Sequence, residues 1–187
     1  NTSEPITFTL KPNGGTATAG SDYADFSNTT GSISIGETSA EVVIGVVDDA
    51  DLEGDETVEL TLSNPSIDIV TIASPNLVAE IVDNDTAVAT IVATKPSANE
   101  NPSENGEFTV YLSKANNTGA PILITYTVGG TATAGSDYAA LSGQVTIPHG
   151  SSSATIIVDT AGYDDATVEN SETVIVSLQS TNHSLVS

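Results

Sequence analysis

The sequence has no cysteine, tryptophan or arginine, and three lysines are its only strongly basic residues. Without cysteine the chain can form no disulfide, zinc–thiolate site or thiol nucleophile. No apolar run approaches the roughly 20 residues that a membrane-spanning helix needs. The 25 acidic residues give a formal net charge of −22. Because nucleic acids and anionic membranes bind basic surfaces, we expect no nucleic-acid partner and no direct membrane insertion, and the charge favours cations.

The residues that are abundant favour β-structure. Valine, isoleucine and threonine dominate, and 15 glycines and 8 prolines separate short alternating segments. No stretch has convincing helical periodicity. A first group of strands is predicted at residues 5–10, 31–35, 40–47, 57–63 and 77–82. A second group is predicted at residues 88–94, 107–113, 121–128, 143–147, 153–159 and 173–178. Short strands at this spacing are typical of a β-sandwich.

An internal repeat divides the chain. The run Gly14–Ala24 recurs without change at Gly129–Ala139, an offset of 115 residues. We therefore predict two repeat units, residues 1–85 and residues 86–187. Their alignment indicates that the first unit lacks the N-terminal strands of the fold and the second lacks its C-terminal strand. We expect a piece of a longer array, with sheet edges open to pairing with another chain.

An acidic loop, residues 48–56, follows the apolar segment 42–47. Six of its nine residues are acids. Carboxylates about 4 Å apart repel by roughly 1 kcal/mol in water, and by about four times that near a protein surface. A hard divalent cation would offset this repulsion, whereas the alternative interpretation is a solvated acidic turn.

Four acids of this loop recur in the second unit, at an offset of 116 residues. They are the candidates for metal ligands, whereas Asp51 and Asp55 have no acidic counterpart and are interpreted as solvated. The recurring pairs are Asp48 and Asp164, Asp49 and Asp165, Glu53 and Glu169, and Glu56 and Glu172.

Three motifs together resemble a Calx-β domain. They are Gly15-Thr16-Ala17-Thr18-Ala19-Gly20-Ser21-Asp22-Tyr23, then Asp48-Asp49 with Glu53 and Glu56, then Val82-Asp83-Asn84-Asp85. The family occurs in sodium–calcium exchangers, integrin β4 and large bacterial surface proteins. The resemblance covers both units and implies an all-β fold of two tandem immunoglobulin-like antiparallel sandwiches, with Ca²⁺ held by loops at one tip.

The resemblance also implies the ligands. In the first unit they are Asp22, Asp48, Asp49, Glu53, Glu56, Asp83 and Asp85. In the second unit they are Glu100, Asp137, Asp164, Asp165, Glu169 and Glu172. Ala50 and Asn84 depart from the acidic pattern of the family. For Asp22 and Asp137 the alternative role is a turn-capping residue bonded to its own loop.

Two functions stay open. The first is a structural or adhesive repeat module of an extracellular or cell-surface protein, expected to be bacterial. Its partners would be calcium ions, neighbouring repeats and a surface protein or carbohydrate ligand, with Ca²⁺ near Asp85 stiffening the junction between repeats. The second is a regulatory calcium sensor of a membrane transporter or signalling protein. We expect no enzyme, because His149 and His183 do not recur and no Ser/His/Asp set is apparent.

Overall fold

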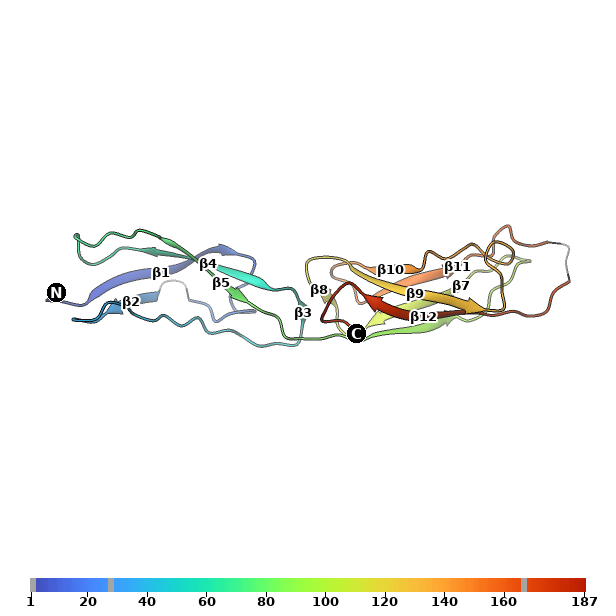
Figure 1. The fold of residues 1–187 in the computed structure, drawn as a ribbon, viewed down its shortest axis with the longest axis horizontal. Helices are drawn as coiled ribbons and strands as arrows, with labels where there is room; N and C mark the ends of the chain where they lie inside the picture. The colour runs from blue at the N-terminus through green and yellow to red at the C-terminus, as the bar shows by residue number, and fades with distance from the viewer. Residues whose placement is uncertain (1–2, 27–28, 166–167) are drawn as a thin grey trace. The chain divides into compact units, whose positions relative to one another are not determined.

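The structure is a computed structural model that describes residues 3–26, 29–165 and 168–187. The chain is all-β, and every regular element of the described residues is a strand (Figure 1). None of these residues forms a helix long and apolar enough to cross a membrane. The chain divides into two compact units, Asn1–Ala50 with Asp55–Asp83, and Asp51–Gly54 with Asn84–Ser187.

The first unit contains one antiparallel sheet of four strands, in the order β2-β1-β4-β5. Its buried core consists of Leu10, Tyr23, Val58 and Leu60, and Val42 and Ile44 pack against it. The strands are β1 Ile6–Gly15, β2 Thr29–Ile33, β4 Glu56–Ser63 and β5 Asn76–Ile81.

The second unit contains two three-stranded antiparallel sheets, in the orders β10-β9-β12 and β11-β7-β6 (Figure 1). Their strands are β6 Ala89–Lys95, β7 Gly106–Leu112, β9 Ile122–Gly130, β10 Gln144–Ile147, β11 Ser153–Val158 and β12 Val174–Thr181. A short parallel pair joins β3 Leu52–Glu53 to β8 Asn116–Asn117.

The sequence pattern explains how the second unit closes. Successive side chains of a strand point to opposite faces, and in β9 the buried residues are Ile122, Ile124 and Tyr126. Val110 of β7 and Ile156 of β11 join them in one apolar core. Because residues from both sheets meet there, the unit is a β-sandwich.

A β-bulge explains why the offset of the repeat changes from 116 to 115 residues at the start of the Gly-rich run. The register between β1 and β4 shifts between Pro12 and Gly14, so Asn13 is an extra residue in the first unit. The offset is therefore 116 before Asn13 and 115 in the run that begins at Gly14.

The predicted strand at residues 40–47 is wrong, whereas each of the other predicted segments contains a strand. Within 40–47 the only ladder contact is an isolated bridge between Tyr23 and Val46. Its counterpart in the second unit is β11, which pairs along its length with β7. Among the described residues no strand pairs along residues 40–47, so this segment lacks the ladder that holds β11. The two-residue strands β3 and β8 were not predicted.

Candidate metal centre

The repeated Gly-rich run folds in the same way in both units. The N–H of Gly135 donates to the carbonyl of Tyr138 at 2.8 Å, and the N–H of Gly20 donates to that of Tyr23 at the same distance. Both glycines have φ +89°, a left-handed conformation that favours glycine. The run therefore folds as a structured loop in both units.

A close backbone approach fixes this loop beside β12. A Cβ atom on Gly130 would lie 2.0 Å from the carbonyl oxygen of Thr173, at φ +115°. Thr173 in turn donates its N–H to Oγ1 of Thr131 at 3.0 Å. Since Glu172 precedes Thr173, the contact brings Glu172 next to the loop that carries Asp137.

The aspartate of each loop caps its own turn. The N–H of Thr133 donates to Oδ2 of Asp137 at 2.6 Å, and that of Thr18 donates to Oδ2 of Asp22 at 2.5 Å. The turn-capping role is therefore confirmed for both aspartates. It does not exclude metal binding, because an ionised carboxylate has two oxygens and about four lone-pair sites.

A second turn presents Glu100. Asn99 and Glu104 exchange backbone hydrogen bonds of 2.9 and 2.7 Å. The hydroxyl of the buried residue Thr160 donates to the carbonyl of Asn99 at 2.7 Å, and its N–H donates to Oδ1 of Asn105 at 3.1 Å. Thr160 therefore anchors this turn at the end of β11.

These two loops and residues 164–172, the second unit's counterpart of the acidic loop, bring three carboxylates together. One oxygen from each of Glu100, Asp137 and Glu169 lies within 4.8 Å of the others. Glu100 and Asp137 are half-buried, and Glu169 is exposed. Glu172 is adjacent, because its side chain is hydrogen-bonded to Asp137.

The surroundings raise the pKa of two glutamates at this cluster. Desolvation raises the pKa of Glu169, and the charges of Asp137, Asp165 and Glu100 raise it further. The hydrogen bond with Asp137 raises the pKa of Glu172, followed by desolvation and the charges of Asp137, Glu169 and Glu100. The fold thus holds several carboxylates near one another. The charged groups that shift the pKa of these two glutamates are all acidic, and no lysine is among them.

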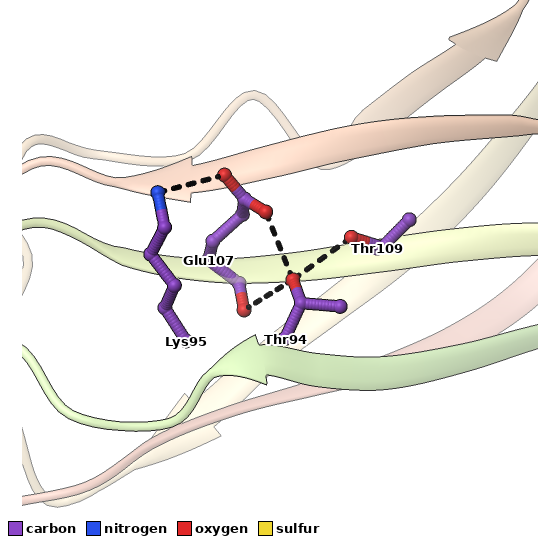
Figure 2. A network of polar contacts seen from close by, with 4 residues as sticks. All are labelled: Thr94, Lys95, Glu107 and Thr109. Carbon is purple, nitrogen blue, oxygen red and sulfur yellow. Dashed lines mark hydrogen bonds and ion pairs between the residues drawn. The ribbon is translucent and has the colours of Figure 1, made fainter.

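A cleft of about 590 Å³ opens beside the cluster. Lys95 lines it, but Lys95 Nζ forms an ion pair with Oε2 of Glu107 at 3.3 Å (Figure 2). The hydroxyl of Thr94 donates to Oε1 of Glu107 at 2.9 Å and is also bonded to Thr109. The hydrogen bond from Thr94 lowers the pKa of Glu107, and Lys95 lowers it further. The lysine therefore compensates Glu107.

The donor set of the second unit fits a hard cation. The three clustered residues and Glu172 offer only carboxylate oxygens, which Ca²⁺ and Mg²⁺ prefer. Three or four carboxylates supply part of the six to eight oxygens of a Ca²⁺ shell, so carbonyls or water would complete it. Among the described residues, the clusters of possible ligands contain no histidine.

The other predicted ligands of the second unit lie outside the three-carboxylate cluster. Oδ2 of Asp164 accepts a hydrogen bond of 3.1 Å from Nδ2 of Asn101. Asp165 acts on the cluster through its charge, which raises the pKa of Glu169. Asn101 and Thr160 were not predicted, since single polar residues in turns carry no signal of their contacts.

In the first unit the structure brings Asp22 and Asp49 together. Their carboxylate oxygens lie within 4.8 Å of one another, and Asp22 is buried. The N–H of Val47 donates to the carbonyl of Asp22 at 3.0 Å, which holds the start of the acidic loop beside the capping turn. Asp48, Glu56 and Asp83 lie outside the carboxylate group that meets there. Glu53 belongs to β3, which folds with the second unit.

Asp85 has a competing partner that the sequence did not reveal. It forms an ion pair with Nζ of Lys114, and both side chains are partly buried. To bind a metal ion, Asp85 would have to give up its ion pair with Lys114. Its role as a metal ligand therefore stays a prediction.

Comparison with known proteins identifies the family. The model of the Calx-beta domain matches residues 2–93 and again residues 82–186. The chain belongs to the Calx-beta domain family. Two solved structures are similar to this pair of Calx-beta domains. "CBD12 from CALX1.2" is 22% identical with a TM-score of 0.38, and the match covers 95% of this chain and 67% of that one. "Calcium binding domain CBD12 of CALX1.1" is 23% identical with a TM-score of 0.37. The match covers 84% of this chain and 63% of that chain, which is less than two thirds of its length.

Proposed function

We propose that this pair of Calx-beta domains binds Ca²⁺ through loop carboxylates and acts as a non-catalytic module. The observation that carries the proposal is the meeting of Glu100, Asp137 and Glu169 within 4.8 Å. Glu172 adds a fourth carboxylate. Desolvation first, for Glu169, and the hydrogen bond with Asp137 first, for Glu172, raise the pKa of these glutamates, and neighbouring carboxylates raise it further. A divalent ion there would offset the repulsion among these carboxylates.

Calorimetric titration with Ca²⁺, combined with thermal melts with and without chelator, tests the proposal. We expect binding heat and a higher melting temperature with Ca²⁺, because a ligand that binds only the folded state stabilises it. Mg²⁺ at the same concentration is the matched control, since it demands a smaller, octahedral shell. If Ca²⁺ produced no binding heat and no shift in melting temperature, the calcium part of the proposal would be wrong.

The module is proposed to be structural or adhesive, in an extracellular or cell-surface protein of a bacterium. The unchanged run Gly14–Ala24 and Gly129–Ala139 supports this proposal, because arrays that expand by duplication keep such runs. Neighbouring repeats, and a surface protein or carbohydrate, are its proposed partners, and Ca²⁺ is proposed to stiffen the junction. Small-angle scattering with and without Ca²⁺ tests the stiffening, which predicts a narrower range of overall dimensions with the ion bound.

The alternative is a regulatory calcium sensor in a transporter or signalling protein. A sensor would bind Ca²⁺ at micromolar concentrations and change conformation, whereas a structural module would gain rigidity and melting temperature. Amide exchange distinguishes them: protection confined to the acidic loops favours the module, and altered exchange throughout the sheets favours the sensor.

Both histidines have structural contacts, which supports a function without catalysis. Nδ1 of His149 accepts a hydrogen bond of 3.3 Å from the N–H of Gly119, and Nδ1 of His183 accepts one of 3.4 Å from that of Leu185. Neither histidine lines the cleft beside the carboxylate cluster.

A further inference from the structure

The bulge in β1 carries one of the two Asn-Gly pairs of the sequence, Asn13-Gly14, and the other pair is Asn105-Gly106. An asparagine that precedes glycine is especially prone to spontaneous deamidation. The reason is that glycine has no Cβ to obstruct the attack of its backbone nitrogen on the asparagine side chain. In a folded chain the reaction also depends on how firmly the side-chain amide and the backbone are held, so the two pairs can be compared directly.

The first pair is weakly held. Asn13 is the extra residue of the bulge, so it lies outside the ladder between β1 and β4. Asn13 and Gly14 are both exposed. Among the described residues, none forms a hydrogen bond with the side chain of Asn13. This side chain is therefore free to turn its Cγ toward the backbone nitrogen of Gly14.

The second pair is held at both of its residues. Oδ1 of Asn105 accepts a hydrogen bond of 3.1 Å from the N–H of Thr160, which is buried. Gly106 is buried at the start of β7, where it pairs with Val158 of β11. A Cβ atom on Gly106 would lie 3.4 Å from that of Ala98, so its backbone is closely packed. Deamidation here would first have to break the bond to Thr160 and open the end of the ladder.

We propose that Asn13 is a site of spontaneous deamidation, and that the fold directs this reaction to Asn13 and away from Asn105. The backbone nitrogen of Gly14 bonds to Cγ of Asn13, the bond from Cγ to Nδ2 breaks, and Nδ2 leaves as ammonia with the proton of the attacking nitrogen. The cyclic imide that forms then takes up water at one of its two carbonyls. Opening at Cγ gives aspartate, whereas opening at the main-chain carbonyl gives isoaspartate, whose main chain runs through Cβ and Cγ.

Either product disturbs the contact that holds the capping loop of the first unit. Gly15 approaches Thr57 so closely that a Cβ atom on it would lie 2.0 Å from the carbonyl oxygen of Thr57. The N–H of Thr57 also donates to Oγ1 of Thr16 at 2.9 Å. Isoaspartate lengthens the main chain just before this contact, and both products add a negative charge at the bulge, opposite Glu59 of β4. Deamidation is therefore expected to loosen the capping loop.

Ageing of the chain at mildly alkaline pH, followed by peptide mass spectrometry, tests the proposal. Both asparagines are measured in the same sample, so Asn105 is the internal control. Asn13 is expected to convert at least about tenfold faster than Asn105, because Asn105 must first be released by local opening. In strong denaturant the two rates should approach each other, since both asparagines precede glycine. Equal rates in the folded chain, or a ratio that denaturant leaves unchanged, would overturn the proposal.

Thermal melts of fresh and aged samples test the effect on the capping loop. Asn13→Ser is the matched control, because serine has no side-chain amide and cannot form the imide. We expect a lower melting temperature for the aged chain than for the fresh one, and no change on ageing for Asn13→Ser. An equal loss in aged Asn13→Ser, or no loss in a chain whose Asn13 has converted, would contradict the loosening of the loop. Chelator is present throughout, so the result does not depend on the proposed calcium site.

Discussion

The two acidic loops begin with the same pair of aspartates, but only the first brings its second aspartate to the capping aspartate. The N–H of Ala24 donates to the carbonyl of Gly45 at 2.7 Å, and its counterpart Ala139 donates to that of Asp159 at 2.8 Å. Asp48 follows three residues after Gly45, whereas Asp164 follows five residues after Asp159. The acidic run therefore starts two residues farther from the capping loop in the second unit.

The neighbouring strand accounts for this difference. In the second unit β11 pairs with β7 as far as Val158, which fixes the residue that meets Ala139. In the first unit residues 40–47 pair with no strand, so their position relative to Ala24 is set by loop contacts and by the packing of Val42 and Ile44 against the core. The third carboxylate of the second cluster comes instead from Glu100, in a segment that has no counterpart in the first unit of this sequence. The second aspartates of the two loops thus take different places, because the strand register before each loop sets how far that aspartate lies from the capping aspartate.

The largest expected effect tests what the two units share. Replacing Gly130 or Gly15 by alanine would place a Cβ 2.0 Å from the carbonyl oxygen of Thr173 or Thr57, at positive φ. Each substitution is expected to cost about 3 kcal/mol of unfolding free energy. In a unit of this size that lowers the melting temperature by about 12 °C or more. Calorimetry measures both variants, and Gly129→Ala, with open space at its Cβ, is the control. If only one of the two variants lost stability, the Gly-rich loops of the two units would be held by different contacts.

The next effect concerns the aspartate at the centre of each site. Asp137→Asn keeps an oxygen for the turn but removes the charge that meets Glu100 and Glu169. We expect Ca²⁺ affinity of the second unit to fall at least about tenfold, about 1.4 kcal/mol. Asp22→Asn is expected to weaken binding less, because Glu172 adds a further carboxylate beside Asp137. Titration calorimetry compares the two variants, with the exposed residue Asp68 changed to Asn as control. A larger loss for Asp22→Asn would reverse the ranking of the two sites.

The sequence predicted most of the strands and the acids that cluster for identifiable reasons. Alternating apolar residues gave β9, and the repeated run gave both capping aspartates. The loss of the strand at 40–47 was not predicted, because the apolar pattern of this segment is intact and such a pattern does not report which strand lies beside it. It also could not predict the pairing of Asp85 with Lys114, since a distant ion pair leaves no local pattern. Calcium binding and the ligand set remain predictions.

A smaller effect isolates the shifted register. Asp49 lies within 4.8 Å of Asp22, whereas the equivalent Asp165 lies outside the second cluster and acts through its charge on Glu169. Asp49→Asn should therefore weaken Ca²⁺ binding severalfold, and Asp165→Asn should change it by less than about twofold, since a charge outside the cluster is partly screened. Calcium titration at two salt concentrations separates the two effects, because the effect of Asp165→Asn on affinity should shrink with salt whereas that of Asp49→Asn should not. Equal losses in both variants would mean that the bound ion draws Asp165 into its shell.

The smallest effect is the pH dependence of the second unit without Ca²⁺. The pKa values of Glu169 and Glu172 are raised above 4.5 in the folded chain. Between 4.5 and the raised values the folded state binds more protons than the unfolded state, so stability falls as pH rises through this window. It recovers when the pH falls and the glutamates become protonated. Glu172→Gln removes one charge, so it should raise the melting temperature at pH 7 and flatten the dependence. Melts from pH 4 to pH 7 in chelator measure this, with Glu80→Gln, an exposed change in β5, as control. An unchanged slope for Glu172→Gln would show that the carboxylates separate into solvent instead of repelling one another.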